Sequence, residues 1–394
     1  MLSVHPNQSQ NCCLNVALCK HIKTWVEISR SALIHNILQY KNIVGDTLLA
    51  PVVKSNAYGH DIGIIAQILN SLEAVSMLCV VSLSEAMGLR MLGITKPLLV
   101  LSIIDAHVRD AISNDIELVA YDFKTICYYN EVAKKLQKKA LIHLKIDTGL
   151  SRIGACQEEA IALVNSVVRL EFIQVSGIFS HLANSEREKN SFAETQIVRF
   201  ANIVQQLEKD GIHIPLRHIS CSAAITALDM SHFTMARLGI GIYGLWPSLE
   251  NALLTKQKYP TFSLKPVMTW KTKPIQIKQV PSGTSIGYDC TYITQRETKV
   301  ATLPIGYWDG YDRGFSNNGY VVVKGIKAAI IGRIAMNLMM VDITDIPQVT
   351  LDDEIILLGE HPDVHADQLA DRIKTINYEI VTRINPSIKR FIVE

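Results

Sequence analysis

The sequence predicts an α/β protein in which an N-terminal (β/α)₈ barrel of the TIM type is followed by a mostly-β domain. Two observations predict the barrel. Short apolar runs alternate with helix-length segments from about residue 45 to residue 240, and eight such runs can be counted. Strands that alternate with helices pair in parallel through crossover connections, and eight units are needed to close a barrel. A doubly wound sheet needs fewer units and usually carries a glycine-rich first turn, which the first run lacks.

The eight apolar runs predict the barrel strands, and segments with helical spacing of their apolar positions predict the helices between them. Phe123–Gln137 and Arg187–Lys209 are examples of such helices. We expect the barrel domain over residues 24–265, although the strand-like segment at 24–29 fits either domain. The predicted strands are Leu48–Lys54, Val75–Ser82, Pro97–Ile104, Glu117–Asp122, Ala140–Asp147, Phe172–His181, His218–Ser222 and Thr234–Leu238.

After about Lys265 the pattern changes to short β-rich runs that are broken by glycine and proline. This pattern predicts a mostly-β domain over residues 266–394, closed by a helix from about His365 to Arg383. Residues 1–23 are expected to form a loosely ordered N-terminal tail. The β-rich runs are Val267–Thr272, Lys299–Pro304, Tyr320–Val323, Ala328–Ile331, Leu338–Ile343 and Glu354–Leu358.

Composition narrows the class of protein. The chain has 394 residues, of which 48% are hydrophobic and 19% charged, so it can bury two cores. Its net charge of +2 contains no basic block, which argues against nucleic-acid binding. No apolar stretch is long enough to span a bilayer, and the first 20 residues lack the features of a signal peptide. Eight cysteines without a C-x-x-C pair indicate buried thiols in a reducing compartment, so we expect a cytoplasmic protein without a metal site.

Polar residues stand at the ends of several predicted strands, where a barrel enzyme places its chemistry. Lys54 ends the first strand, and the other positions are Asp147, Arg152, His181, Ser222, Arg237 and Gly239. Alone, a lysine after an apolar run is more often a surface residue whose charge reaches into water. A poorly hydrated lysine amine can instead form a Schiff base with an aldehyde. Such an amine among cations suggests an anionic aldehyde ligand, and pyridoxal phosphate fits that description.

Several motifs closely resemble those of the alanine racemases, which are pyridoxal-phosphate enzymes of fold type III. The resemblance runs from about Thr24 to Arg390. It implies a homodimeric isomerase with shared active sites that interconverts L- and D-alanine and supplies D-alanine for peptidoglycan. The motifs are Val53-Lys54-x-Asn56-Ala57-Tyr58-Gly59-His60, Lys145–Gly154, Arg237-Leu238-Gly239-Ile240-x-x-Tyr243-Gly244, Tyr288 with Tyr292, Pro304–Arg313, Gly332–Met336 and Asn377-Tyr378-Glu379.

The resemblance also implies a role for each matching residue. Lys54 binds the cofactor covalently and acts as a base, and Tyr288 of the partner subunit acts on the opposite face of the substrate. Racemisation needs two such groups, because one base reaches only one face of Cα. The cofactor is held by Tyr58, Ser222, Arg237, Gly239, Ile240 and Tyr378. The substrate is bound by Arg152, Met336 and Asn337, with His181, Lys145 and Cys221 behind these residues and Tyr307 and Arg313 at the entrance.

Physical chemistry supports three of these roles. An arginine keeps its proton, so Arg237 opposite the pyridine nitrogen leaves that nitrogen unprotonated and the ring a weaker electron sink. A free tyrosine has a pKa of about 10, so Tyr288 needs nearby positive charge or hydrogen bonding, with His181 as the expected relay. Lys145 lies seven residues before Arg152 and points inward if the strand alternates, so a buried ammonium beside the arginine would be costly. Members of the resembled family often carry a carbamylated lysine here, which turns the repulsion into a salt bridge. The sequence leaves the carbamylation of Lys145 open.

Three positions depart from the family pattern. Ala335-Met336-Asn337 stands where Cys-Met-Asp is usual, which replaces an acid by a neutral amide and suggests a broader substrate range. Cys221 stands where an asparagine is usual and removes two donors near the cofactor. Residues 385–390 replace the usual Arg-Val-Pro-Arg near the C-terminus without touching any proposed chemistry.

Other functions remain possible on the sequence alone. A racemase with broader specificity, for example toward serine, fits the same motifs. A barrel-type pyridoxal-phosphate decarboxylase uses the same lysine but needs a cysteine-containing loop, and the second domain has only Cys290. A non-catalytic pyridoxal-phosphate carrier would not need Tyr288 or Met336. Asp147-Thr148-Gly149 matches an aspartic-protease tripeptide, but that chemistry needs two such carboxylates close together.

Overall fold

The computed structural model describes residues 22–186 and 191–394, so residues 1–21 of the expected N-terminal tail and the start of the helix predicted at Arg187 lie outside the described residues. The chain divides into two compact units. One spans Ser31–Pro266, and the other joins the residues up to Arg30 with Val267–Glu394. Within the described ranges, no helix is both long and apolar enough to cross a membrane.

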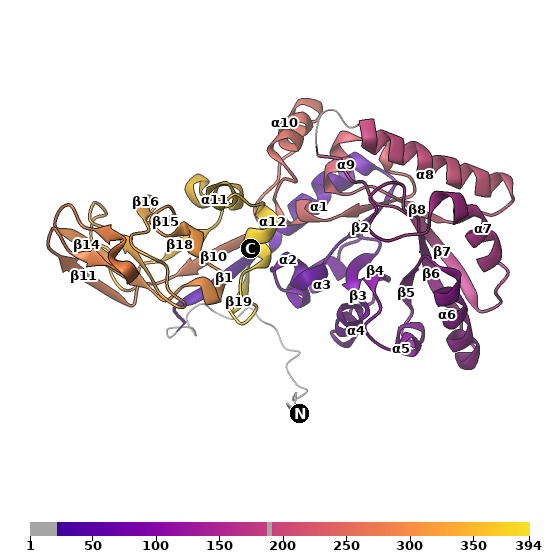
Figure 1. The fold of residues 1–394 in the computed structure, drawn as a ribbon, viewed down its shortest axis with the longest axis horizontal. Helices are drawn as coiled ribbons and strands as arrows, with labels where there is room; N and C mark the ends of the chain where they lie inside the picture. The colour runs from indigo at the N-terminus through magenta and orange to yellow at the C-terminus, as the bar shows by residue number, and fades with distance from the viewer. Residues whose placement is uncertain (1–21, 187–190) are drawn as a thin grey trace. The chain divides into compact units, whose positions relative to one another are not determined.

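The first unit contains eight parallel strands in a six-stranded and a two-stranded sheet, which agrees with the barrel that the sequence predicts (Figure 1). Six strands pair in chain order from β3 to β8, and β2 pairs with β9. Backbone hydrogen bonds join the two sheets into a ring, among them those from Val53 N to Cys79 O (2.8 Å) and from Thr234 N to Arg217 O (3.2 Å). The strands are β2 (Leu48–Pro51), β3 (Leu78–Ser82), β4 (Leu98–Ile103), β5 (Ile116–Ala120), β6 (Ala140–Lys145), β7 (Ile173–Phe179), β8 (Leu216–His218) and β9 (Met235–Leu238).

Helices surround these strands, and Figure 1 shows α4 to α8 on the outside of β3–β8. Side-chain caps define where several helices begin: Ser82 accepts from the Glu85 amide at the start of α4, and Asp122 accepts from the Thr125 amide at the start of α6. The helices are α1 (Arg30–Val44), α2 (Lys54–Tyr58), α3 (Ile62–Asn70), α4 (Leu83–Met91), α5 (Val108–Ser113), α6 (Phe123–Leu136), α7 (Gln157–Val167), α8 (Ser191–Lys209), α9 (Ser222–Ala227) and α10 (Leu249–Lys258), with 3₁₀ turns η2 (Asp229–Ser231) and η3 (Ile240–Tyr243).

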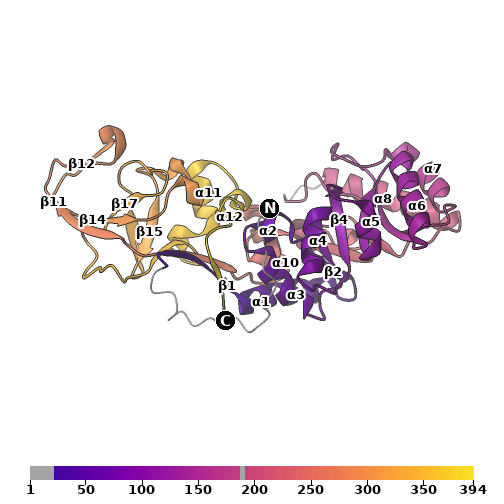
Figure 2. The same cartoon turned by 90° about the horizontal axis from the view of Figure 1, so that it is seen from below.

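The second unit is mostly β, which confirms the predicted fold class. A six-stranded sheet has the order β16-β15-β18-β10-β1-β19, and a three-stranded sheet has the order β11-β14-β17. Figure 2 shows the turn beside the β12–β13 hairpin projecting from the body of this unit. The strands are β10 (Met268–Thr272), β11 (Gln276–Val280), β12 (Ser285–Ile286), β13 (Tyr292–Ile293), β14 (Thr298–Leu303), β15 (Tyr320–Val323), β16 (Ile326–Ala329), β17 (Met339–Asp342), β18 (Ile355–Leu358) and β19 (Arg390–Val393).

The strand-like segment at 24–29, which the sequence could not place, is a strand of this second unit. β1 (Thr24–Ser29) runs antiparallel to β10 and parallel to β19. Val26 and Ile28 of β1 are fully buried in the sheet. The first and last strands of the described chain are therefore neighbours in one sheet.

The prediction of a single closing helix from about His365 to Arg383 is wrong. Two helices occupy this range, α11 (Ala366–Ile373) and α12 (Asn377–Thr382). Lys374 adopts a left-handed conformation with φ of 59° and ends α11, because an α-helix cannot continue through that backbone geometry. Asn377 at the start of α12 donates to the Asp367 carboxylate at 2.6 Å and ties the two helices together.

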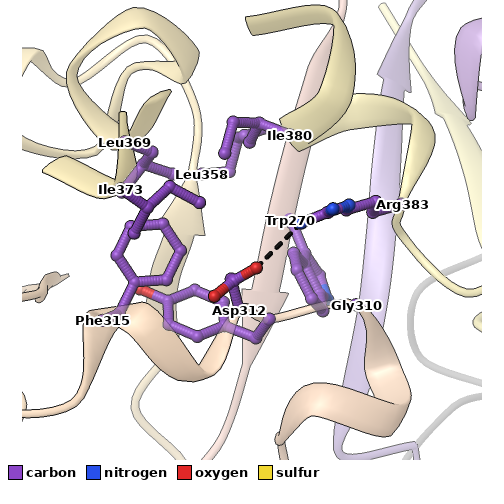
Figure 3. A pocket seen from close by; sticks show the side chains of 10 residues that line it. Trp270, Gly310, Asp312, Phe315, Leu358, Leu369, Ile373, Ile380 and Arg383 are labelled. Atoms are coloured by element: carbon purple, nitrogen blue, oxygen red, sulfur yellow. Dashed lines mark hydrogen bonds and ion pairs between the residues drawn. The ribbon is translucent and has the colours of Figure 1, made fainter. Parts of the chain in front are cut away.

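The interior of the second unit contains a small pocket between the sheet and these helices (Figure 3). Trp270 and Phe315 line it, and an ion pair of 2.8 Å joins Arg383 to Asp312 at its side. None of the residues with a predicted catalytic role lines this pocket, so it is part of the core packing.

A glycine substitution tests the packing of the barrel. In Gly244→Ala the new Cβ would lie 1.8 Å from the Lys265 carbonyl oxygen, at a φ of +79°. We expect the free energy of unfolding to fall by about 3–5 kcal/mol. Gly211→Ala is the control, because Gly211 has the same φ of +79° but open space around it. The control should lose only about 1–2 kcal/mol. Equal shifts of the two thermal unfolding temperatures would contradict the close approach.

Candidate active site

The predicted residues of the barrel gather at the ends where the chain leaves the strands, here called the rim. Lys54 follows β2, Lys145 ends β6, His181 follows β7, and Ser222 begins α9 just after β8. Arg237 lies in β9 and Gly239 follows it. This placement agrees with the rule that barrel enzymes build their sites at the carboxyl-terminal face.

Lys54 does not end its strand, which corrects the sequence-based expectation. β2 ends at Pro51, and Lys54 begins a short turn in which Ser55, Asn56, Ala57 and Tyr58 have φ values of 55°, 54°, 53° and 53°. Four consecutive left-handed residues other than glycine are costly, at about 1–2 kcal/mol each. Such a conformation persists only where its surroundings determine it, and it is typical of functional sites.

Hydrogen bonds from several directions hold this left-handed turn. The Ser55 amide donates to the Glu85 carboxylate at 2.6 Å, and the second oxygen of Glu85 accepts from the Val81 amide at 2.9 Å. The Asn56 side chain accepts from the Ile62 amide at 2.9 Å. The turn therefore fixes where Lys54 leaves the backbone. Glu85 was not predicted, because its role depends on contacts that no sequence spacing reveals.

The electrostatic surroundings of Lys54 favour a neutral amine. Burial, reinforced by the charge of Arg152, lowers the pKa of the Lys54 ammonium, and the Glu85 carboxylate partly offsets this effect. A lysine with a lowered pKa is a better nucleophile toward an aldehyde. Lys54 thus has the chemistry that covalent attachment of a carbonyl cofactor requires.

A polar cradle lies beside Lys54. The Ser222 hydroxyl accepts from the amides of Gly239 (3.0 Å) and Gly241 (3.2 Å). A Cβ on Gly239 would lie 3.0 Å from the Tyr58 hydroxyl, so a side chain here would crowd that hydroxyl. Burial raises the pKa of Tyr58, so its hydroxyl stays a donor. Hydroxyls and glycine amides that converge in this way suit a phosphate group. Ile240, also predicted here, is buried at the start of η3.

The buried Arg237 guanidinium is held by five acceptors. Its Nη1 donates to the carbonyl oxygen of His218 (3.1 Å) and to Nδ1 of the same ring. Its Nη2 donates to Ser180 O (2.7 Å), Ile219 O (3.2 Å) and His181 Nδ1 (3.3 Å). Burial lowers the pKa of Arg237 to about 10, so it remains charged at neutral pH. Among the described residues, its Nε–H is the donor left without a protein acceptor, and it can face a pyridine nitrogen.

Lys145 and Arg152 complete a cationic cluster, which we define as Lys54, Lys145, Arg152 and Arg237. Burial and then the charges of Arg152 and Arg237 lower the pKa of the Lys145 ammonium to about 7. The same causes hold the pKa of His181 well below its usual range. Within the described ranges, no hydrogen-bond or ion-pair partner of the Lys145 amine is found, and it lies 5.3 Å from the centre of the Phe179 ring.

The remaining predicted residues belong to the second unit. Tyr288 lies in η4 (Tyr288–Cys290) and is 70% exposed. Tyr307 begins η5 (Tyr307–Asp309), and its amide and that of Trp308 donate to the carbonyls of Ala335 and Met336. An ion pair of 2.9 Å between Asp289 and Arg333 joins the Tyr288 turn to the same loop. The structure thus brings Tyr288, Tyr307 and Met336 onto adjoining loops.

Three other predicted residues of this unit are partly or fully accessible. Arg313 begins η6 (Arg313–Phe315) and shares an open cleft with Tyr307 and Arg383. Asn337 is exposed next to Met336, and Tyr378 is half-buried in α12. In the barrel, the Cys221 thiol lies 3.1 Å from the Ser185 hydroxyl and precedes α9. The described residues contain no His, Cys, Asp or Glu cluster that could hold a metal ion.

Comparison with known proteins decides the family. The model of the alanine racemase N-terminal domain matches residues 28–247, and the model of the C-terminal domain matches residues 267–392. The chain belongs to the alanine racemase family. The predicted family is thereby confirmed, and the protein is a pyridoxal-phosphate-dependent racemase, an isomerase. The cradle and Arg237 fit this cofactor, because they offer donors for a phosphate and for a ring nitrogen within one rim.

Relatives cover nearly the whole chain. Alanine racemase 2 of Caldanaerobacter subterraneus subsp. tengcongensis is 39% identical over 373 residues, which are 93% of this chain and 94% of the relative. The structure of alanine racemase from Clostridium difficile 630 has a TM-score of 0.88 and 35% identity, and the match covers 95% of this chain and 96% of that one. An alanine racemase from Bartonella henselae, solved with covalently bound pyridoxal phosphate, has a TM-score of 0.82 and 27% identity, with coverages of 94% and 100%.

The low pKa of Lys145 predicts a chemical modification. A neutral amine adds CO₂ to form a carbamate and releases one proton, and the product would neutralise charge beside Arg152. In ¹³C-bicarbonate at pH 8 the protein should therefore show a carbamate ¹³C signal that disappears in Lys145→Arg. Lys138→Arg, at a lysine paired with Asp115 at 2.7 Å, should keep the signal. Absence of the signal in the native protein would refute carbamylation.

Proposed function

We propose that the protein interconverts L- and D-alanine, with Lys54 acting on one face of the substrate Cα and Tyr288 of the partner subunit on the other. The observation that carries this proposal is Lys54, a lysine with a lowered pKa fixed by a left-handed turn beside a phosphate cradle. Bound pyridoxal phosphate would withdraw electrons from Cα and make its proton removable. The residues around it would then decide where that proton goes.

Each residue of the rim has a distinct role in this proposal. Lys54 binds the cofactor and, when released by the substrate, takes or returns a proton. Arg237 keeps its own proton and offers only a hydrogen bond to the ring nitrogen, which limits side reactions. Arg152 binds the substrate carboxylate, where a planar fork matches two oxygens. Tyr58 and Ser222 hold the phosphate.

The proposed homodimer follows from the need for a second acid–base group. A single lysine cannot reach both faces of Cα, and Tyr288 is the matching residue of the second unit. Tyr288, Trp308 and Met336 are 70%, 65% and 54% exposed, which is unusual for large apolar side chains on adjoining loops. A second copy of the chain is the occupant that this surface suits, with Tyr307 and Arg313 of the open cleft at the entrance.

Broader amino-acid specificity is a second candidate function. Asn337 is an exposed neutral amide beside Met336, whose amide is proposed to bind the substrate carboxylate. A neutral side chain repels that carboxylate less than an acid does, so larger amino acids such as serine could be accepted. This candidate changes the substrate range and leaves the two-base chemistry unchanged.

The proposed cellular role is to make D-alanine in the cytoplasm, from where it is supplied for peptidoglycan. The five described cysteines, Cys79, Cys127, Cys156, Cys221 and Cys290, are free thiols, as expected in a reducing compartment.

Two variants test the two-base assignment. Lys54→Ala should lose the visible absorption of the lysine-bound cofactor and racemisation in both directions. Tyr288→Phe should keep that absorption but lower kcat by about 10²–10⁴, because a general acid–base group contributes this much. Tyr292→Phe, at a half-buried phenol four residues further on, should leave activity unchanged. Full activity of Tyr288→Phe in either direction would refute the assignment.

Restoring the acid tests specificity. If the neutral amide at Asn337 is what admits larger substrates, Asn337→Asp should lower kcat/KM for L-serine relative to L-alanine several-fold. Asn318→Asp, at an exposed asparagine of the same unit, is the control for the added charge. An unchanged ratio for Asn337→Asp would contradict the second candidate.

A further inference from the structure

A row of four buried polar side chains crosses the interior of the barrel. It consists of Glu117 on β5, His143 on β6, His218 on β8 and Arg237 on β9, and we call it the buried polar row. The exposed fractions are 8%, 0%, 0% and 4%. His143 Nε2 lies 2.7 Å from Glu117 Oε2, and His143 Nδ1 lies 2.8 Å from His218 Nε2. His218 Nδ1 contacts Arg237 Nη1, so the four groups are joined end to end.

The arginine fixes the position of every proton in the row. A guanidinium only donates, so His218 Nδ1 must accept and the ring carries its hydrogen on Nε2. That hydrogen is donated to His143 Nδ1, and the His143 hydrogen on Nε2 is donated to Glu117. The reverse direction, which begins with a protonated Glu117, would place an N–H of His218 against an N–H of Arg237. Both imidazoles are therefore neutral, and the carboxylate accepts at the far end.

Strand β7 is shaped around these rings. A Cβ on Gly177 would lie 2.3 Å from His143 Nδ1, so a side chain there would displace the ring. Phe179 stacks on His218 with 4.9 Å between ring centres and an angle of 5°. The Arg237 guanidinium lies 5.3 Å from the centre of the Phe179 ring. The row is thus enclosed by the barrel and shielded from water.

Arg237 needs a counter-charge that its direct contacts do not supply. Its hydrogen-bond partners are carbonyl oxygens and two neutral imidazoles, and among the described residues it forms no ion pair. Burying an uncompensated guanidinium is costly. The carboxylate of Glu117, at the opposite end of the row, is the anion connected to it. Burial, together with Arg237 and His143, holds the pKa of His218 well below its usual range, which keeps the intervening ring neutral.

We propose that Glu117, His143 and His218 are positioning residues that supply the counter-charge of Arg237 through two neutral rings and hold its Nε–H toward the ring nitrogen of the cofactor. The inference rests on the proposed function only for what the Nε–H faces. The charge coupling between Glu117 and Arg237 is a property of the protein without cofactor.

A double-mutant cycle in the apoprotein tests the coupling. Glu117→Gln keeps an oxygen that can accept from His143 and removes only the charge. It should lower the apparent melting temperature by about 5 °C or more. In an Arg237→Gln background the same substitution should shift it by less than about 2 °C, because the cation is already gone. Residues without contact or shared partners normally give additive effects, so additivity would overturn the proposal. Glu131→Gln, at an exposed carboxylate of α6, is the additive control.

A second measurement does not depend on whether the variants fold. ¹⁵N NMR of the native apoprotein at neutral pH should show His143 and His218 as neutral rings protonated on Nε2, as the hydrogen-bond directions of the row require. An imidazolium, or a hydrogen on Nδ1 of either ring, would overturn the proposal. Coupling in the double-mutant cycle without racemase activity would support this inference and refute the proposed function. Additivity in the cycle with full racemase activity would refute this inference and leave the proposed function intact.

Discussion

Positive charge confined to one rim governs the chemistry of this barrel. Lys54, Lys145, Arg152 and Arg237 lie in one electrostatic field, so each raises the cost of charge on the others. Water cannot relieve this cost for the buried members. The two lysines can relieve it by losing a proton, whereas the arginines cannot. Under the proposed function the cations of the rim would divide the work, because the arginines would bind anions and orient the cofactor ring while the lysines carry reactive amines. An anionic cofactor and an anionic substrate are the ligands that such a rim favours.

The backbone around Lys54 adopts a conformation that is unfavourable in free energy. Four residues in the left-handed region turn the chain sharply after β2, and the Glu85 carboxylate holds both the turn and the end of β3. The same carboxylate partly opposes the fall in the pKa of Lys54. One acidic side chain thus couples the geometry of the reactive lysine to its protonation. The phosphate cradle begins at Tyr58, the last residue of the turn, so the turn also sets the distance between the amine and the cradle.

Much of the fold follows from the sequence, because eight apolar runs of buried parallel strands are a strong pattern. The rim residues follow as well, since barrel chemistry collects at strand ends. The left-handed turn could not be predicted from the sequence. Only one of its four residues, Asn56, is of a type that often adopts positive φ. The pairing of β1 with β10 and β19 required contacts across almost the full length of the chain. Glu117 and His143 did leave a signal, because each is a polar residue inside a largely apolar strand.

The pairing of β1 with β10 and β19 has a consequence for biosynthesis. The ribosome makes β1 first, but its two sheet neighbours appear about 240 and 360 residues later, after the entire barrel. At bacterial or eukaryotic elongation rates of about 5–20 residues per second, this segment waits for on the order of tens of seconds with unsatisfied strand edges. Trp25, Val26 and Ile28 are apolar, so the nascent chain carries an unpaired, aggregation-prone strand segment throughout that interval. The barrel can fold cotranslationally, whereas the other unit becomes complete only once β19 has been synthesised.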